Sequence, residues 1–445
     1  MQDTKGGMRL QWISPTAFLV VLSGILMNTS IAEIAGIAIP VFYAVLPLLI
    51  FRLLVTDVRF PRREIEVPFK VTVFSCSVAA ILSIVTLGHI VLTSNSALSE
   101  IKQLGARFAL LLFFLLSYLA FHRKSVRYRA VLYTAGLLKV LLLYGIYQFA
   151  ALFYDFPRFL DFLRNSPSFG LRDLESTEPG GWLETLRATS VWTEPSYSAL
   201  PAALLLYLLY FGPASRLERA TWTFVTLLYA LLTFSRVVWL TVLLLVLFLW
   251  FARFRLRLID APNAKAVERH KYVLFLLLIG IFSITWPSIA PQITSDVSAL
   301  GRSTSVLIGW RIFFDYPVFG SGFNSFQVFE GAYAQGLDYV GFETIVHNMF
   351  SGYAQQMGVL GLAYAFLPIA LVLSISQISI GQRSYIALLF VLLGCFQGDY
   401  MYMSLTWFVL AIVASEAIEV ERISPVDPAH PQRQASHTSA LRTSE

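Results

Sequence analysis

The chain has 445 residues, of which 57% are hydrophobic and only 13% charged, with a net charge of +6. A soluble domain carries about twice this share of charge, and a disordered chain lacks so much apolar surface, so both classes are excluded. The basic residues lie in short connections between apolar runs rather than on one domain, so nucleic acid is not an expected partner.

Apolar runs long enough to cross a membrane recur along the chain. They predict about twelve transmembrane helices, at residues 12–31, 34–54, 71–92, 104–121, 131–153, 196–211, 220–235, 237–252, 272–288, 358–378, 384–398 and 400–418. The fold class that follows is an all-α integral membrane protein. Cys76 and Cys395 both lie in apolar runs, so neither a disulfide framework nor a zinc site is expected.

The charges of the connections predict the orientation of the chain. If the N-terminus is cytoplasmic, most Lys and Arg residues fall on the cytoplasmic side, so we expect both termini there. The first apolar run is long and continues directly into a second one, which indicates an uncleaved helix rather than a signal peptide. Residues 1–421 then form one membrane domain, and the tail 422–445, rich in Pro, Ser and His, is predicted to be disordered.

On this topology two external connections are long, at residues 154–195 and 289–346. Connections of such length usually carry function. The two halves of the chain show no internal repeat, which disfavours a transporter of the major facilitator type.

Two cations are predicted at membrane depth. Lys139 lies inside the fifth span, and Arg236 lies near the external face where the seventh and eighth spans meet. An Arg at the bilayer centre costs about 2.5 to 3.5 kcal/mol even on lenient scales, so such residues usually face a cavity or a partner. For Arg236 the alternative is an interfacial residue that reaches the headgroups. For Lys139 a substrate phosphate, an acidic neighbour and a structural ion pair all stay open.

The second external loop carries Arg302 and Arg311, whose guanidinium groups suit phosphate oxygens. Solvated loop charge is the alternative. If the stretch is helical, their nine-residue separation places them on opposite faces, and a shared target needs a bend. Pro317, Gly320 and Gly322 follow and predict a tight turn with exposed N–H groups, which is weak support for an anion cradle.

His347 is the one histidine of six that is predicted at the outer face near the membrane. A neutral imidazole can take a proton from a hydroxyl at working pH, although a hydrogen-bonded structural histidine is the alternative. Glu194 and Tyr197 lie at the outer start of the sixth span, where Glu194 could simply cap the helix. The chain contains no Asp-x-Asp pair and no phosphate-binding glycine loop.

Four stretches, taken together and in order, resemble the superfamily of O-antigen ligases and O-antigen polymerases. They are EPSY at 194–197, LTFSR at 232–236, the Arg pair leading into PVFGSGFNSF at 317–326, and His347-Asn348 followed after nine residues by Gly358-x-x-Gly361. The resemblance is most specific from 233 to 362. It implies a GT-C-like fold in the bacterial inner (cytoplasmic) membrane and glycan transfer from undecaprenyl diphosphate at the periplasmic face, with no metal or cofactor.

The resemblance also implies roles for single residues. His347 would deprotonate or orient the acceptor hydroxyl, with Asn348 beside it, and Arg236, Arg302 and Arg311 would bind the diphosphate. We expect direct displacement with inversion. Glu194 is the carboxylate that a retaining route would use. Tyr197 and Lys139 complete the predicted substrate-binding residues.

Within the superfamily we predict a polymerase of lipid-linked repeat units, because EPSY and the two large external loops are more typical of that branch. The alternative is a ligase that passes the finished chain to lipid A core. A lipid-linked oligosaccharide flippase or other transporter is the alternative from a different class, and a non-catalytic scaffold is a third. Expected partners are the undecaprenyl-diphosphate-linked glycan, membrane lipid, a chain-length regulator and a flippase.

Overall fold

The structure is a computed structural model that describes residues 14–26, 30–34, 37–56, 69–92, 97–154, 156–157, 188–192, 195–253, 297–323, 325–337, 346–375, 378–398 and 400–415. Three predicted features lie outside the described residues: the span 272–288, the tail 422–445 and Glu194. Most of the first external loop, 154–195, lies outside them as well.

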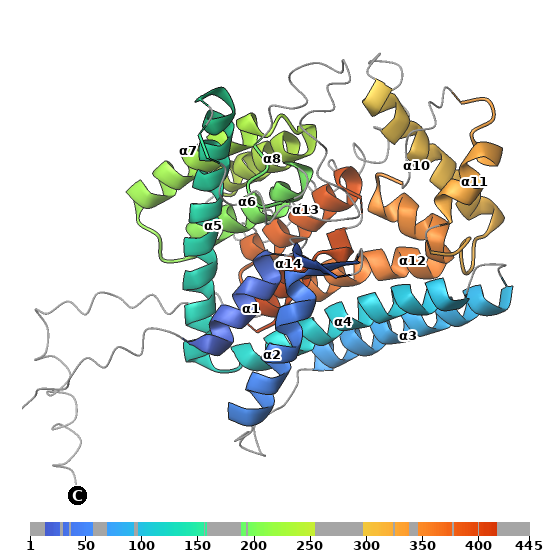
Figure 1. The fold of residues 1–445 in the computed structure, drawn as a ribbon, viewed down its shortest axis with the longest axis horizontal. Helices are drawn as coiled ribbons and strands as arrows, with labels where there is room; N and C mark the ends of the chain where they lie inside the picture. Colours follow the sequence, from blue (N-terminus) through green and yellow to red (C-terminus); the bar gives the residue numbers. More distant parts are fainter. Residues whose placement is uncertain are drawn as a thin grey trace, which may run out of the picture.

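The described chain is mainly helical, as Figure 1 shows. In order, the helices are α1 (Pro15–Ile25), α2 (Val41–Thr56), α3 (Phe69–Leu92), α4 (Ala97–Phe121), α5 (Lys124–Tyr154), η2 (Pro195–Ser198), α6 (Ala199–Phe211), α7 (Arg216–Leu232), α8 (Arg236–Arg253), α10 (Val297–Asp315), α11 (Phe326–Tyr333), α12 (Met349–Ser374), α13 (Ile380–Phe396), η3 (Tyr400–Tyr402) and α14 (Ser404–Ala414). An antiparallel hairpin of β1 (Ser30–Ile34) and β2 (Ile37–Pro40) separates α1 from α2.

Each predicted span within the described residues overlaps a helix. Among the described residues, four helices are long and apolar enough to cross a membrane, at Phe69–Val91, Ala97–Phe121, Lys124–Ala151 and Met349–Ser374. Shorter apolar helices include α6, α13 and α14. The chain is therefore a membrane protein, while the total of twelve spans and the GT-C-like arrangement stay predictions.

Two segments differ from the all-α, loop-connected expectation. The predicted span 12–31 contains a helix that ends at Ile25 and a strand that begins at Ser30. The second predicted external loop, 289–346, carries two helices, α10 and α11, rather than a simple connection.

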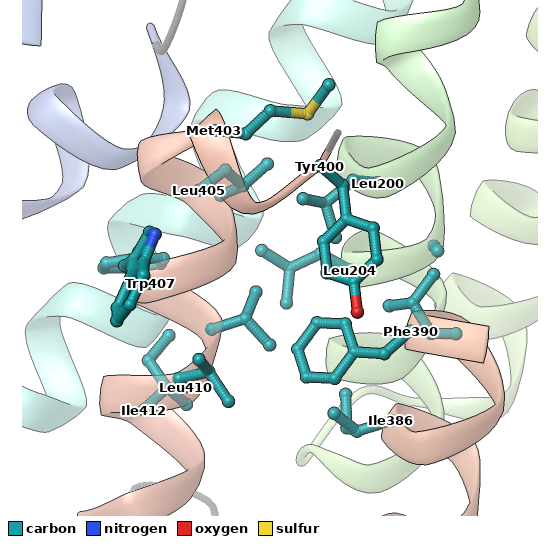
Figure 2. Close-up of a cluster of buried hydrophobic side chains, with 14 of the residues drawn as sticks. Leu200, Leu204, Ile386, Phe390, Tyr400, Met403, Leu405, Trp407, Leu410 and Ile412 are labelled. Carbon is teal, nitrogen blue, oxygen red and sulfur yellow. The ribbon is translucent and has the colours of Figure 1, made fainter. Parts of the chain in front are cut away.

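The core lies around α6, α13 and α14, whose side chains are buried on nearly all sides. Figure 2 shows Leu200 and Leu204 of α6 facing Phe390 of α13 and Tyr400 of η3. The Phe390 and Tyr400 rings stack with their centroids 5.5 Å apart. A helix that is apolar all round belongs in the interior of a bundle, and these helices form the frame on which the other elements pack.

Basic side chains cap helix ends on one side of the molecule. Lys70, at the start of α3, donates to the carbonyl of Ser374, and Arg383 donates to Leu373 O at 3.1 Å, so both cap the end of α12. Arg127, near the start of α5, likewise donates to Ser415 O after α14. Cations stabilise the negative end of the helix dipole. Three of the basic residues predicted to face the cytoplasm therefore cap helix ends rather than standing as isolated charges.

Candidate active site at the end of α13

His347 lies just before α12, where α10, α12 and the turn after α13 meet. Its backbone N–H donates to the hydroxyl of Ser305 on α10 at 3.4 Å. On the other side, the turn after α13 passes so close that a Cβ on Gly398 would lie 4.0 Å from the Cα of His347. Gly398 has a φ of +84°, a conformation that glycine adopts without strain. The backbone of His347, a half-buried residue, is thus held on two sides.

Asn348 fixes the backbone next to His347. Its Oδ1 accepts the N–H of Ser351 at 3.0 Å, which caps α12, and its Nδ2 donates to the carbonyl of Cys395 at the end of α13 at 3.3 Å. Asn348 is also only 6% exposed. Both ends of the amide are therefore engaged by protein, so the geometry favours a role in positioning His347 over the predicted contact with substrate.

Downstream of His347, α12 is broken at Gly358, which has φ +65° and ψ −149°. The segment 317–322 fills the break. Ser321 N donates to Gln355 O at 2.8 Å, Gly322 N to Gln356 O at 3.1 Å, and Val359 N to Pro317 O at 2.8 Å. These bonds satisfy backbone groups that the broken helix leaves without helical partners.

The same contacts correct the predicted anion cradle. The N–H groups of Ser321 and Gly322 donate hydrogen bonds to backbone carbonyls of α12, so these N–H groups do not face an anion. Around them the buried amide of Gln355 donates to the hydroxyls of Ser321 and Ser325 at 2.6 and 2.8 Å. The two glycine motifs of the sequence, 317–322 and 358–361, are one structural unit.

Arg302 and Arg311 are not brought together. Both lie on the continuous helix α10, and nine residues of helix place them on opposite faces. Arg302 lies one turn before Ser305, which holds His347, so it belongs to the same side of α10. Arg311 instead donates to Tyr333 O and Gln335 O, both at 2.9 Å, and ties the end of α11 to α10. Arg311 is thereby separated from the other predicted diphosphate ligands.

Tyr197, in η2, lies level with the end of α13. The side chain of Tyr385 donates to Ala203 O at 2.8 Å, and Figure 2 shows that α6 runs antiparallel to α13, with Leu200 beside Tyr400. Since η2 directly precedes α6, Tyr197 lies at the height of the turn that approaches His347.

Arg236 reaches the same level from α8. The Phe248 ring, late in α8, lies 6.0 Å from that of Tyr385, early in α13, and α8 also packs against η2. Arg236 lies 12 residues before Phe248, and Gln397 lies 12 residues after Tyr385. Equal lengths of helix rise by the same distance, so Arg236 is inferred to lie level with the end of α13.

The turn before Arg236 is unusual. Phe234 has a φ of +47°, which is rare for a bulky side chain. The turn is held by Thr233 Oγ1, which donates to Ala230 O at 2.6 Å and accepts from Ser235 N at 3.2 Å. It places Arg236 as the first residue of α8, where the helix dipole disfavours a cation unless an anion is near.

Comparison with protein families shows that residues 221–366 match the family model described as O-antigen ligase. The match supports membership of the superfamily of O-antigen ligases and polymerases for this segment of the chain. The matched segment contains Arg236, Arg302, Arg311, His347 and the Gly358 break. A comparison with curated proteins found no match.

Lys139 lies outside the O-antigen ligase segment and away from the site. Its Nζ forms an ion pair with Glu218 at 2.5 Å and lies 5.2 Å from the centre of the Trp222 ring. Glu218 is in the first turn of α7, at the opposite end of that helix from Arg236. Of the alternatives left open for Lys139, the structure supports the ion pair, and the predicted substrate contact gains no support.

A cavity of about 530 Å³ lies at this same far end of α6 and α7. It is lined by Tyr210, Arg216, Arg219 and Ala220. The cavity therefore does not coincide with the residues around His347.

Among the described residues outside the O-antigen ligase segment, the buried His89, Glu100 and Arg107 were not predicted as functional. Arg107 lies within the predicted span 104–121, where a cation is itself a signal. Glu100 falls just outside that span, and the sequence gives no sign that it pairs with His89, 11 residues away on another helix.

Proposed function

We propose that the chain polymerises undecaprenyl-diphosphate-linked oligosaccharide repeat units at the periplasmic face of the bacterial inner membrane. The family match supports glycan transfer of the O-antigen ligase type. The proposal is supported by the packing of α8, which begins at Arg236, against η2, which carries Tyr197. It is also supported by His347 beside the turn after α13, with Arg302 one turn from the Ser305 contact.

The chemistry suits these residue types. The acceptor hydroxyl loses its proton to His347 as its oxygen bonds to the anomeric carbon of the donor sugar. The bond between that carbon and the diphosphate oxygen breaks, and the leaving undecaprenyl diphosphate takes the electron pair. Arg236 and Arg302 stabilise the developing charge, so the leaving group needs no protonating acid and no metal ion. Attack from the face opposite the leaving group inverts the configuration.

Arg311 and Asn348 have supporting roles in this proposal. Arg311 holds α11 against α10, and Asn348 keeps the start of α12, and with it His347, in place. Glu194 remains the carboxylate for a retaining route, so product linkages that keep the donor configuration would replace the inverting mechanism with one through Glu194.

Ligation to lipid A core is the second candidate, because the matching family model is described as O-antigen ligase. The donor, the histidine and the arginines would serve in the same way, and only the acceptor differs. A gel of surface polysaccharide from a deletion strain separates the two. Single repeats on lipid A core indicate a lost polymerase, whereas full-length chains left on the lipid carrier indicate a lost ligase.

A flippase or other transporter predicts a different defect. Replacing His347 by Ala in an enzyme leaves lipid-linked repeats accumulating on the periplasmic side. A flippase defect traps them on the cytoplasmic side, and a scaffold tolerates the loss of His347, Arg236 and Arg302 one at a time. Cytoplasmic accumulation, or normal polymer, in the His347→Ala strain would reject the proposed function.

A further inference from the structure

Helix α4 carries a polar stripe in an apolar environment. Glu100, Gln103 and Arg107 are spaced by three and four residues, which places them on one face of the helix. Glu100 is fully buried and Arg107 is 2% exposed. Charged groups inside a membrane protein are costly unless they are well paired, so a buried stripe of this kind calls for specific partners.

The first partner is the segment that fills the break in α12. Glu100 Oε1 accepts the N–H of Phe323 at 3.2 Å, and Oε2 lies 2.8 Å from Nδ1 of His89, on α3. The other ring nitrogen of His89 lies 2.7 Å from Phe319 O. A carbonyl oxygen only accepts, so Nε2 carries a proton and donates it. Glu100 and His89 together hold both ends of segment 319–323.

The second partner is η3, the short helix after Gly398. The guanidinium of Arg107 lies between two rings, with its carbon 4.1 Å from the centre of Phe323 and 4.4 Å from that of Tyr402. The hydroxyl of Tyr402 also donates to Oε1 of Gln103. The stripe on α4 therefore contacts segment 319–323 and η3 at once, and Arg107 joins the two.

These two segments are connected to His347 by different routes. Segment 319–323 is continuous with the backbone that fills the Gly358 break in α12, and His347 lies at the start of α12. The turn that leads into η3 contains Gly398, which passes close to the His347 backbone. Both partners of α4 are short non-helical or 3₁₀ segments, which have few backbone bonds of their own to fix them.

We propose that Glu100, His89 and Arg107 form a buried clasp that positions the two segments around His347. The clasp residues are positioning residues for glycan transfer, and in that respect the inference rests on the proposed function. All three lie outside residues 221–366, so the N-terminal helices α3 and α4 supply a part of the site geometry that the O-antigen ligase segment lacks.

Two substitutions of Glu100 test whether hydrogen bonds hold the clasp together. In Glu100→Gln, the amide oxygen can still accept from Phe323 N–H and the amide N–H can donate to His89, which still donates to Phe319 O. In Glu100→Ala both contacts are lost, and two buried polar groups lose their partner. A clasp built on hydrogen bonds therefore tolerates Gln and not Ala. Glu218→Ala, which breaks the distant ion pair with Lys139, is the matched control.

The test is hydrogen exchange, followed by mass spectrometry, on the full-length protein in detergent, together with surface polymer in cells. For Glu100→Ala we expect exchange about tenfold faster in peptides covering 319–323 and 355–359, unchanged exchange in α6, and loss of polymer. Glu100→Gln and Glu218→Ala should match the parent. Arg107→Lys, which keeps the charge without the flat guanidinium, should accelerate exchange around Phe323 and Tyr402.

Unchanged exchange at 319–323 in both Glu100→Ala and Arg107→Lys would overturn the clasp, as would Glu100→Gln behaving like Glu100→Ala. If the Glu100→Ala protein does not accumulate in cells, the clasp is tested with Arg107→Lys and Glu100→Gln, using the same exchange and polymer measurements. Failure of the proposed function would give a different result. In that case the His347→Ala strain would keep full polymer, while hydrogen exchange in the clasp variants would still change as expected. Faster local exchange with normal polymer would remove the positioning role and leave only a structural contact.

Discussion

Gly320 and Gly358 each pack against the backbone of the segment that carries the other, at the break in α12. A Cβ on Gly320 would lie 2.2 Å from the carbonyl carbon of Gln356, and one on Gly358 would lie 2.3 Å from Val318 O. Both residues also have positive φ, at +73° and +65°. The two glycines therefore fix how segment 317–322 enters the helix that carries His347.

Replacing either glycine with alanine should destabilise the protein strongly. Gly358→Ala and Gly320→Ala each combine a left-handed backbone with a clash against main chain, and we expect a loss of more than about 2 kcal/mol. Gly105→Ala is the control, since a Cβ there meets nothing within 4 Å and alanine favours a helix. Thermal unfolding in detergent measures the effect. A midpoint equal to that of the parent in Gly358→Ala would show that the break is not required.

Asn348 should act on stability and activity together. Asn348→Ala removes the cap of α12, which costs about 1 kcal/mol, and lets the His347 backbone move. Asn348→Asp keeps the oxygen that accepts from Ser351 N, so we expect it to retain most of the stability. Unfolding midpoints and polymer length on gels provide the comparison. If Asn348→Ala has parental stability and no polymer, the side chain contacts substrate after all.

The three arginines should separate into two classes. Arg236→Ala and Arg302→Ala remove charge from the developing diphosphate, and we expect transfer to fall about 100-fold or more. Arg311→Ala should mainly loosen α11, with faster hydrogen exchange in 326–337 and a smaller loss of transfer. Transfer is measured with purified protein and a synthetic prenyl-diphosphate donor. If all three variants lose transfer equally, and hydrogen exchange of α11 is unchanged in Arg311→Ala, then Arg311 binds the diphosphate as first predicted.

The Lys139–Glu218 pair should matter for stability and not for transfer. The hydrogen bond from Lys139 lowers the pKa of Glu218 below its usual 4.5. A carboxyl whose pKa is lowered on folding stabilises the protein above its unfolded pKa, and this contribution is lost as the pH falls through the folded value. The stability difference between the parent and Glu218→Gln should thus be present above about pH 4.5 and shrink below it. Loss of polymer in Glu218→Gln at neutral pH would instead connect the pair to function.

Local sequence properties determined the class of the protein and the places of its helices. Each described apolar run overlaps a helix, because the hydropathy of a membrane helix is visible within about 20 consecutive residues. The motifs around Arg236 and His347 were visible for the same reason, and they pointed to the family that residues 221–366 match. The break at Gly358 and the positive φ of Gly320 were consistent with the glycine spacing, although their purpose was not visible.

Tertiary structure alone decided which of these residues work together. It packed segment 317–322 into the break at Gly358, paired Lys139 with Glu218, and placed Glu100 against Phe323, 223 residues away in the chain. Hydropathy and helical periodicity act over a few turns, whereas these partners are chosen by packing and by the need to satisfy buried polar groups. That choice depends on which segments meet in space, which a single linear sequence does not record.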